Sequence, residues 1–263
     1  MFGPFATPSE VRRLRGELKA ARSLATRLLQ SKLAEALAAQ MLRRHTRDFE
    51  ALQEFVEKGV LSRAAIVHKT EDSLAFYRRL IRGYDLAPER ILEIGVKGGG
   101  SLLLWRALFP QARVVGLDIK PTLKDLPEGI AVVRGDQSDP KALKRLARNH
   151  GPFDLVIDDG SHVSEHQRIS FVTLSRYLRP GALYVIEDLH TVAKPAGGEV
   201  DYGADVWGDF VRAVFWRFQK RPVEELPLHE SLRPLLRHVT DMTMGRRQLA
   251  LRIGEPPEPV DEG

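Results

Sequence analysis

Apolar and polar residues recur along the chain with two different periods. From about residue 90 onward, short apolar runs rich in β-branched residues alternate with amphipathic stretches. Short runs of this kind predict buried strands, whereas apolar residues spaced three and four positions apart predict helices. The five predicted strands lie in ILEIGV, ARVVGLDI, IAVVRGD, FDLVIDDG and GALYVIEDL.

This alternation predicts the fold class. Strands that alternate with helices form parallel βαβ units, and helices then cover both faces of the sheet. We therefore expect an α/β fold with a doubly wound, mostly parallel, Rossmann-like sheet. Near the end of the chain, HVTDMTM and QLALRI flank the turn residues MGRR, which predicts a C-terminal antiparallel hairpin that closes the sheet.

A helical pattern fills the N-terminal quarter. Thr7-Pro8-Ser9-Glu10 is typical of a helix start, and apolar residues then keep a rough heptad spacing, so residues 8–58 are predicted to form one or two long helices. An apolar stripe of this length needs a partner. We expect a helical extension over residues 1–66, through which the chain forms a homo-oligomer or packs on its own main domain.

The main domain is predicted over residues 67–254. It begins with a shorter helix in KTEDSLAFYRRLIRGYDL that ends near Gly83. Trp207, Phe210, Val214 and Phe218 follow helical spacing after the fifth strand, which favours a core or subunit face over a wall of the substrate site. Residues 192–204 are a candidate lid, and the proline-rich acidic tail, residues 255–263, is expected to be disordered.

Composition and charge exclude several classes of protein. The 263 residues are 43% hydrophobic and 29% charged, which is ordinary for a globular chain. The absence of cysteine excludes disulfides, thiolate metal ligands and a cysteine nucleophile. No apolar run approaches the roughly 20 residues that span a bilayer, and no signal peptide is recognisable. We expect a cytoplasmic protein without a membrane partner.

The formal net charge of +5 is concentrated near the N-terminus. A clustered basic patch can contact nucleic acid. A solvated helix face is the simpler interpretation, and we do not expect nucleic acid as a partner.

A glycine-rich loop follows the first predicted strand and opens a helix. It contains Glu93, Gly95, Gly98 and Ser101. Glycines let a ligand approach the backbone, and a helix N-terminus offers free N–H groups. NAD and S-adenosylmethionine both bind such loops. The acidic Glu93 ahead of the glycines favours S-adenosylmethionine, whereas Asp118, about 20 residues on, would bind ribose hydroxyls of either cofactor.

Two further strand ends add to this candidate cofactor site. Asp136 and Gln137 end the third strand, where they could meet the adenine edge. Capping of the next helix is the alternative for Asp136, although Asp139 suits that position better. Asp158 ends the fourth strand and is expected to face the cofactor.

Paired acids end the fourth and fifth strands. Asp158-Asp159 and Glu187-Asp188 should converge at one edge of the sheet, because successive strands in the second half of a doubly wound sheet are neighbours. Crowded carboxylates need a cation or raise each other's pKa. Oxygen ligands from Asp159, Glu187 and Asp188 suit Mg²⁺. The alternative is that some of these acids cap helices or pair with lysine and arginine.

His162 is the candidate general base. It lies three residues beyond Asp159, ahead of a helix that Ser164 and Gln167 are predicted to begin with a capping box. A loop histidine is commonly only a surface residue. Beside a metal that lowers the pKa of an alcohol, however, a neutral imidazole can take the hydroxyl proton. His166 and His190 are weaker candidates for the same role.

The span from about Val67 to Thr191 resembles the Mg²⁺-dependent, S-adenosylmethionine-dependent O-methyltransferases that modify sugars of macrolide antibiotics, the mycinamicin and macrocin type. The resemblance lies in HK with a downstream tyrosine, LEIGV with GGGSL, GLDI, GDQSD, FDLVIDDGSH and LYVIEDLHT. It implies a methyltransferase domain over residues 67–254, metal ligands at Asp159, Glu187 and Asp188, and a base at His162. These positions coincide with those chosen from the residues themselves.

We therefore expect an O-methyltransferase that uses S-adenosylmethionine and Mg²⁺ to modify a hydroxyl of a saccharide or glycosylated natural product. Three alternatives remain open at this point. The acceptor could be a catechol or phenol, the protein could be a non-catalytic nucleic-acid-binding module, or the nucleotide site could serve a nicotinamide dehydrogenase.

Overall fold

The computed structural model describes residues 69–123, 126–193 and 201–259. The predicted N-terminal helices lie outside these residues, and so does most of the candidate lid. The division at residue 66 and the role of the extension therefore stay predictions.

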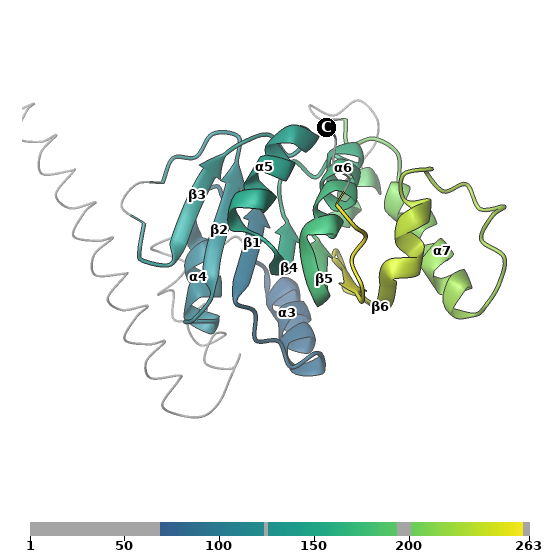
Figure 1. The fold of residues 1–263 in the computed structure, drawn as a ribbon, viewed down its shortest axis with the longest axis horizontal. Coiled ribbons are helices and arrows are strands. Elements are labelled where there is room, and N and C mark those ends of the chain that lie inside the picture. The colour runs from purple at the N-terminus through teal and green to yellow at the C-terminus, as the bar shows by residue number, and fades with distance from the viewer. Residues whose placement is uncertain (1–68, 124–125, 194–200, 260–263) are drawn as a thin grey trace, which may run out of the picture. The chain divides into compact units, whose positions relative to one another are not determined.

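A seven-stranded sheet is the centre of the described domain (Figure 1), and its strand order is β3-β2-β1-β4-β5-β7-β6. Its strands are β1 (Arg90–Ile94), β2 (Arg113–Asp118), β3 (Ile130–Arg134), β4 (Phe153–Asp158), β5 (Leu178–Ile186), β6 (Val239–Met244) and β7 (Leu249–Ile253). The first five pair in parallel, whereas β7 runs antiparallel to both β5 and β6. The predicted doubly wound sheet and its C-terminal hairpin are thus confirmed.

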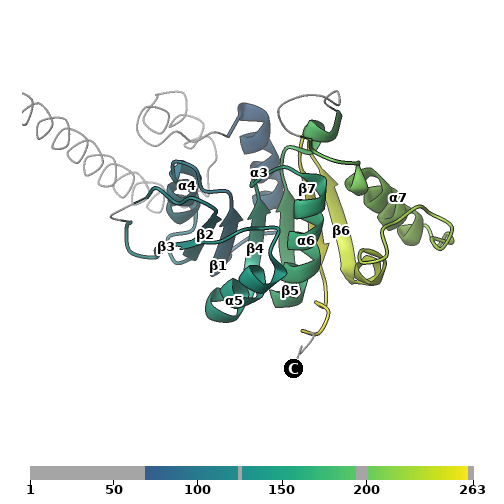
Figure 2. The same cartoon turned by 90° about the horizontal axis from the view of Figure 1, so that it is seen from above.

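Helices cover both faces of the sheet. Figure 2 shows α3 and α4 on one side of the strands and α5 and α6 on the other. The helices are α3 (Glu71–Gly83), α4 (Gly100–Leu108), α5 (Pro140–His150), α6 (Ser164–Leu174) and α7 (Val206–Phe218), with 3-10 turns η1 (Ser175–Tyr177), η2 (Leu189–Ala193) and η3 (Arg233–His238). The helix predicted before the first strand is α3, which ends at Gly83 as expected.

Helix caps show where local sequence signals succeed and fail. The side chain of Asp139 caps α5 by accepting from the Lys141 amide at 2.9 Å, as predicted. The capping box predicted for α6 is wrong. Val163 is the N-cap residue and makes no side-chain cap bond. Gln167 instead accepts a hydrogen bond from the Trp207 indole at 3.1 Å, because its side chain points into the core.

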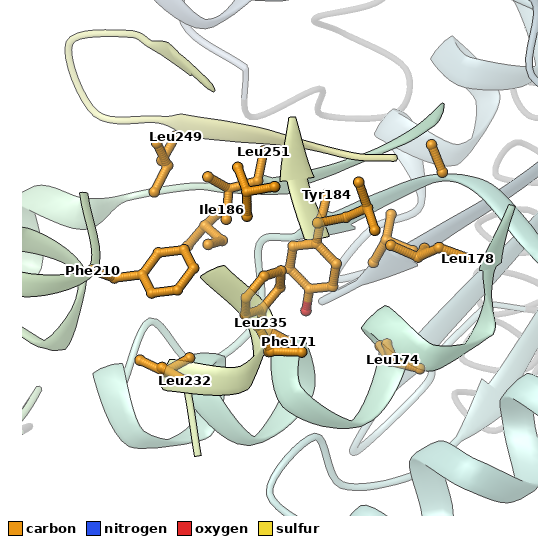
Figure 3. Close-up of a cluster of buried hydrophobic side chains, with 14 of the residues drawn as sticks. Phe171, Leu174, Leu178, Tyr184, Ile186, Phe210, Leu232, Leu235, Leu249 and Leu251 are labelled. Atoms are coloured by element: carbon orange, nitrogen blue, oxygen red, sulfur yellow. The ribbon is translucent and has the colours of Figure 1, made fainter. Parts of the chain in front are cut away.

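The larger hydrophobic cluster lies between the sheet and α5, α6 and α7 (Figure 3). Edge-to-face aromatic contacts join Phe171 to Tyr184, Trp207 and Phe210. The predicted core face of α7 is therefore correct for Trp207, Phe210 and Val214. Phe218 at the end of the helix departs from it and is 43% exposed.

The acidic tail is described as far as residue 259. The Glu258 carbonyl accepts a hydrogen bond from Arg176 at 2.6 Å. The disorder predicted for the acidic tail stays a prediction for residues 260–263. Among the residues that the structure describes, no helix is both long and apolar enough to cross a bilayer.

Candidate active site

Strand alternation decides where the acidic side chains at the carboxyl edge of the sheet point. Successive residues of a strand face opposite sides. Glu93 is paired with Ile157, one residue before Asp158, and Asp158 is paired with Ile186, one residue before Glu187. Glu93 and Glu187 therefore face the side of α3, whereas Asp158 faces the side of α6.

A buried lysine lies among the acids on the α3 side. Lys69 Nζ lies 2.6 Å from Asp159 Oδ2 and 3.5 Å from Glu93 Oε1, and it also donates to Glu187 Oε1. The hydroxyl of Tyr77 donates to the same Glu187 oxygen at 2.6 Å. Burial lowers the pKa of Lys69, but Glu187, Glu93 and Asp159 more than offset this and raise it above its ordinary value. The ammonium therefore keeps its charge.

Glu93 is fully buried and does not reach the cavity beside the glycine loop. Its Oε2 accepts a hydrogen bond from the Trp105 indole at 3.2 Å. Burial raises the pKa of Glu93 to about 7, although Lys69 opposes the shift. Its proposed part in cofactor binding is thus indirect, through the position of the loop that follows it.

Asp159, His162 and Asp188 form a second cluster at the rim. Each offers one ligand atom, and these atoms lie within 4.8 Å of one another. His162 Nε2 is 3.7 Å from Asp188 Oδ2. Its Nδ1 is buried and lacks a hydrogen-bond partner among the described residues.

Both His162 and Asp188 have left-handed backbone conformations, with φ of 60° and 56°. Such conformations are uncommon for residues with side chains and concentrate at functional sites. The strained backbone thus supports a functional role for the rim cluster.

The predicted metal ligands are brought together only in part. Asp159 and Asp188 share the rim cluster with His162, whereas the Glu187 side chain is turned toward Lys69 and Tyr77. Glu187 as a metal ligand therefore stays a prediction.

Two basic residues near Asp188 add to the rim. His190 Nδ1 and Arg247 NH1 lie 3.7 Å and 3.8 Å from Asp188 Oδ1. Sequence reasoning missed Arg247, which lies between β6 and β7 and was interpreted only as part of a turn. It missed Lys69 as well, although the HK motif with its tyrosine was a usable signal.

A cavity of 260 Å³ lies beside the glycine loop. Of the predicted cofactor-binding residues, Gly95, Asp118, Asp136 and Gln137 line it, and Glu93, Gly98, Ser101 and Asp158 do not; its other lining residues are Ile94, Leu117, Ile119, Gly135, Gly160, Ser161 and His166. The cavity thus combines two carboxylates with an apolar wall. Such a lining suits a nucleoside.

The carboxylate of Asp118 fixes the glycine loop. Its Oδ2 accepts hydrogen bonds from the amides of Val96 and Lys97 at 2.9 Å and 3.1 Å. Gly95 precedes them with a φ of 86°. A Cβ at Gly95 would lie 2.1 Å from the Asp159 carbonyl oxygen, so only glycine fits this position.

Gln137 and Asp158 are occupied by each other. The Gln137 amide donates to Asp158 at 3.1 Å and accepts from the Ser161 amide at 2.6 Å. Tyr184 donates to the other Asp158 oxygen at 3.4 Å. Burial raises the pKa of Asp158 to about 7. The expectation that Asp158 faces the cofactor is not met, because its side chain points to the interior on the side of α6.

Comparisons with known proteins find similar methyltransferases, both by sequence and by fold. Residues 92–189 match the model of a family described as a methyltransferase domain. The chain is 46% identical over 133 residues to the mycinamicin VI 2''-O-methyltransferase of Micromonospora griseorubida. The aligned segment covers 48% of this chain and 33% of that protein. It is 47% identical over 135 residues to the demethylmacrocin O-methyltransferase of Streptomyces fradiae, covering 48% and 34%.

A solved structure is similar as well. The MycE methyltransferase from the mycinamycin biosynthetic pathway, in complex with Mg, S-adenosylhomocysteine (SAH) and mycinamycin VI, superposes with a TM-score of 0.60 and 28% identity, covering 86% of this chain and 63% of that one. The chain matches only about one third of the length of the two O-methyltransferases named above. The described domain thus has a Rossmann-like methyltransferase fold, and its resemblance to the sugar O-methyltransferases of macrolide biosynthesis is confirmed.

Proposed function

We propose that this chain transfers a methyl group from S-adenosylmethionine to a hydroxyl of a saccharide or glycosylated natural product, with Mg²⁺ as a second cofactor. One observation carries the proposal. The segment 159–162 contributes Gly160 and Ser161 to the nucleoside-sized cavity and Asp159 and His162 to the rim cluster. The cofactor site and the reactive groups are thereby adjacent.

The cavity fits S-adenosylmethionine by its lining. Asp118 and Asp136 offer carboxylates for ribose and adenine donors, and Ile119, which is 58% exposed, offers an apolar surface. Gly95 and Gly160 leave the backbone open there. When bound, this cofactor supplies a methyl group on a sulfonium, whose carbon–sulfur bond breaks as the acceptor oxygen bonds to the carbon.

The rim fits a hard divalent cation by its donor set. Asp159 and Asp188 offer carboxylate oxygens, and Glu187 is the third ligand in the proposal. When bound, Mg²⁺ would bring the acceptor hydroxyl beside these residues and lower its pKa. Lys69 and Tyr77 hold the Glu187 side chain by one oxygen, Oε1.

His162 takes the acceptor proton in the proposed reaction. Its ring lies beside Asp188, and the Thr191 hydroxyl holds its backbone carbonyl at 3.2 Å. An alcohol attacks a sulfonium well only when it loses its proton as the new bond forms. The products are then the methyl ether, the thioether form of the cofactor and a proton on His162.

The acceptor class rests on the relatives. Their names specify O-methylation of mycinamicin VI and demethylmacrocin, and the similar structure holds mycinamycin VI. These similarities support a sugar hydroxyl over a catechol.

The test is methyl transfer from labelled S-adenosylmethionine to a panel of glycosides and catechols, with Mg²⁺ or with EDTA. We expect transfer to a glycoside that EDTA abolishes. Transfer that is indifferent to EDTA would contradict the metal, and transfer to catechols alone would contradict the acceptor class.

We also propose a homo-oligomer formed through residues 1–66 and a cytoplasmic location. The heptad-like apolar stripe and the absence of cysteine support these two points. Light scattering on the full chain and on a chain without residues 1–66 tests the first. An unchanged oligomer size after the deletion would contradict it.

A further inference from the structure

Lys69 occupies an unusual position for a lysine. Its side chain is 2% exposed, and its ammonium contacts the carboxylates of Glu93 in β1, Asp159 directly after β4 and Glu187 directly after β5. Lysine is rarely buried unless it is paired. Thr70, the next residue, caps α3 by accepting from the Ser73 amide at 3.3 Å, which fixes the backbone beside Lys69.

The carboxylates around this ammonium outnumber it. Glu93, Asp159 and Glu187 carry three potential negative charges on the α3 side of the sheet against one positive charge. Glu93 and Glu187 are almost completely buried, whereas a quarter of the Asp159 side chain is exposed at the rim. Asp159 thus links the buried ion pairs to the rim cluster.

Lys69 contacts two of the three carboxylates to which the proposed function assigns the divalent cation. It binds Asp159 and Glu187, whereas Asp188 is contacted by His162, His190 and Arg247. The Glu187 side chain points to Lys69 and stays outside the cluster of possible ligand atoms. Lysine and cation would therefore share the carboxylates of Asp159 and Glu187.

We propose that Lys69 is a positioning residue that holds Asp159 and Glu187 as a pair and competes with the divalent cation for them. The inference rests on the proposed function and deepens it. The ammonium keeps the two carboxylates in place without a metal, and it weakens cation binding by its own charge. Lys69 would thereby set the cation requirement of the enzyme from the α3 side of the sheet, through the two carboxylates that it holds.

Lys69→Met tests this inference because it removes the charge and keeps much of the side-chain volume. We expect the Mg²⁺ concentration for half-maximal thermal stabilisation to fall at least about tenfold, since a positive charge within a few ångströms of the cation is lost. The kcat at saturating Mg²⁺ should fall at the same time, because Glu187 loses its anchor. A purely structural lysine would lower stability without changing the Mg²⁺ concentration required.

Tyr77→Phe is the matched control. It removes a hydrogen bond to the same Glu187 oxygen but no charge. Its half-saturating Mg²⁺ concentration should stay within roughly twofold of the wild-type value, because no net charge changes. A shift as large as that of Lys69→Met would assign the effect to general loosening of Glu187 and would overturn the competition.

Buried charges left without their partner often prevent folding. The double variant Lys69→Met with Glu93→Gln answers that case, because it removes one charge of each sign and leaves Asp159 and Glu187 intact. Its half-saturating Mg²⁺ concentration should fall in the same direction but by less than in Lys69→Met, because Glu93→Gln also removes a negative charge from the cluster.

An unchanged or higher Mg²⁺ requirement in the folded variant overturns the inference, and so does the absence of any Mg²⁺ response in both the variant and the wild type. A response in the variant alone supports it. The proposed function is judged separately, by the effect of EDTA on wild-type methyl transfer.

Discussion

The carboxylates at the carboxyl edge of the sheet fall into an interior group and a rim group. The interior group, Glu93, Asp158 and Glu187, is at most 3% exposed, and protein donors occupy it. In the rim group, Asp159 and Asp188 have side chains that are 25% and 31% exposed. The two groups are neighbours in sequence, yet we expect Glu93 and Asp158 to govern stability. The rim group, with Glu187 as its proposed third ligand, should govern catalysis.

His162→Ala should have the largest effect, because it removes the proposed base from the rim. Methyl transfer should fall by about 10²- to 10⁴-fold, as is typical of a lost general base. Binding of S-adenosylmethionine, measured by calorimetry, should be nearly unchanged. His190→Ala is the matched control, since His190 also lies 3.7 Å from Asp188. An equal loss in both variants would contradict the assignment of the base to His162.

Asp188→Asn should have the second-largest effect on methyl transfer. Several kcal/mol of transition-state stabilisation would be lost with a metal ligand, which corresponds to roughly 10²- to 10³-fold in kcat. The melting temperature should change little, because the nearest basic nitrogens, those of His162, His190 and Arg247, lie 3.7 Å or more from the Asp188 carboxylate. A large loss of stability with retained turnover would move Asp188 into the interior group.

Glu93→Gln should change the pH dependence of stability. Burial raises the pKa of Glu93 to about 7 in the folded state, from 4.5 in an unfolded chain. Between these values the unfolded chain releases the proton first, so wild-type stability falls as pH rises from about 4.5 to 7. The variant should lack this decline, which amounts to up to about 3 kcal/mol. Urea unfolding across this range measures it, and parallel curves for both proteins would refute the expectation.

Asp139→Ala is a control for both groups, because Asp139 is an acid that belongs to neither of them. It removes the cap of α5 and should lower the free energy of unfolding by about 1 kcal/mol. Methyl transfer at saturating substrate should equal that of the wild type. Reduced kcat in a fully folded variant would show that stability and catalysis are not separable in this domain.

Much of the fold could be predicted because short apolar runs that alternate with helical stretches are typical of a parallel sheet. The neighbourhood of the two acid pairs also followed from strand order, and β4 and β5 are indeed adjacent. Which of these acids points inward depends on the pairing register of the strands and on where each strand ends. The sequence does not predict strand ends precisely enough to assign the direction of each side chain. Asp158 and Glu187 were therefore assigned to a cofactor and a metal without regard to their buried partners.

Partners distant in sequence could not be predicted either. Lys69 precedes Asp159 by 90 positions and Glu187 by 118, and Arg247 follows the whole parallel sheet. No local period connects such residues. Only the packing of α3 and of the β6–β7 turn against the strand ends brings them to the site.

Gly95 links the two proposed ligand sites more tightly than their shared edge of the sheet requires. A Cβ at Gly95 would meet the Asp159 carbonyl oxygen at 2.1 Å, so the glycine loop and the segment that carries Asp159 pack backbone against backbone. We expect a displacement of either segment to shift the other. Occupancy of the nucleoside cavity should then alter the affinity for the divalent cation, and by reciprocity the cation should alter the affinity for the cofactor.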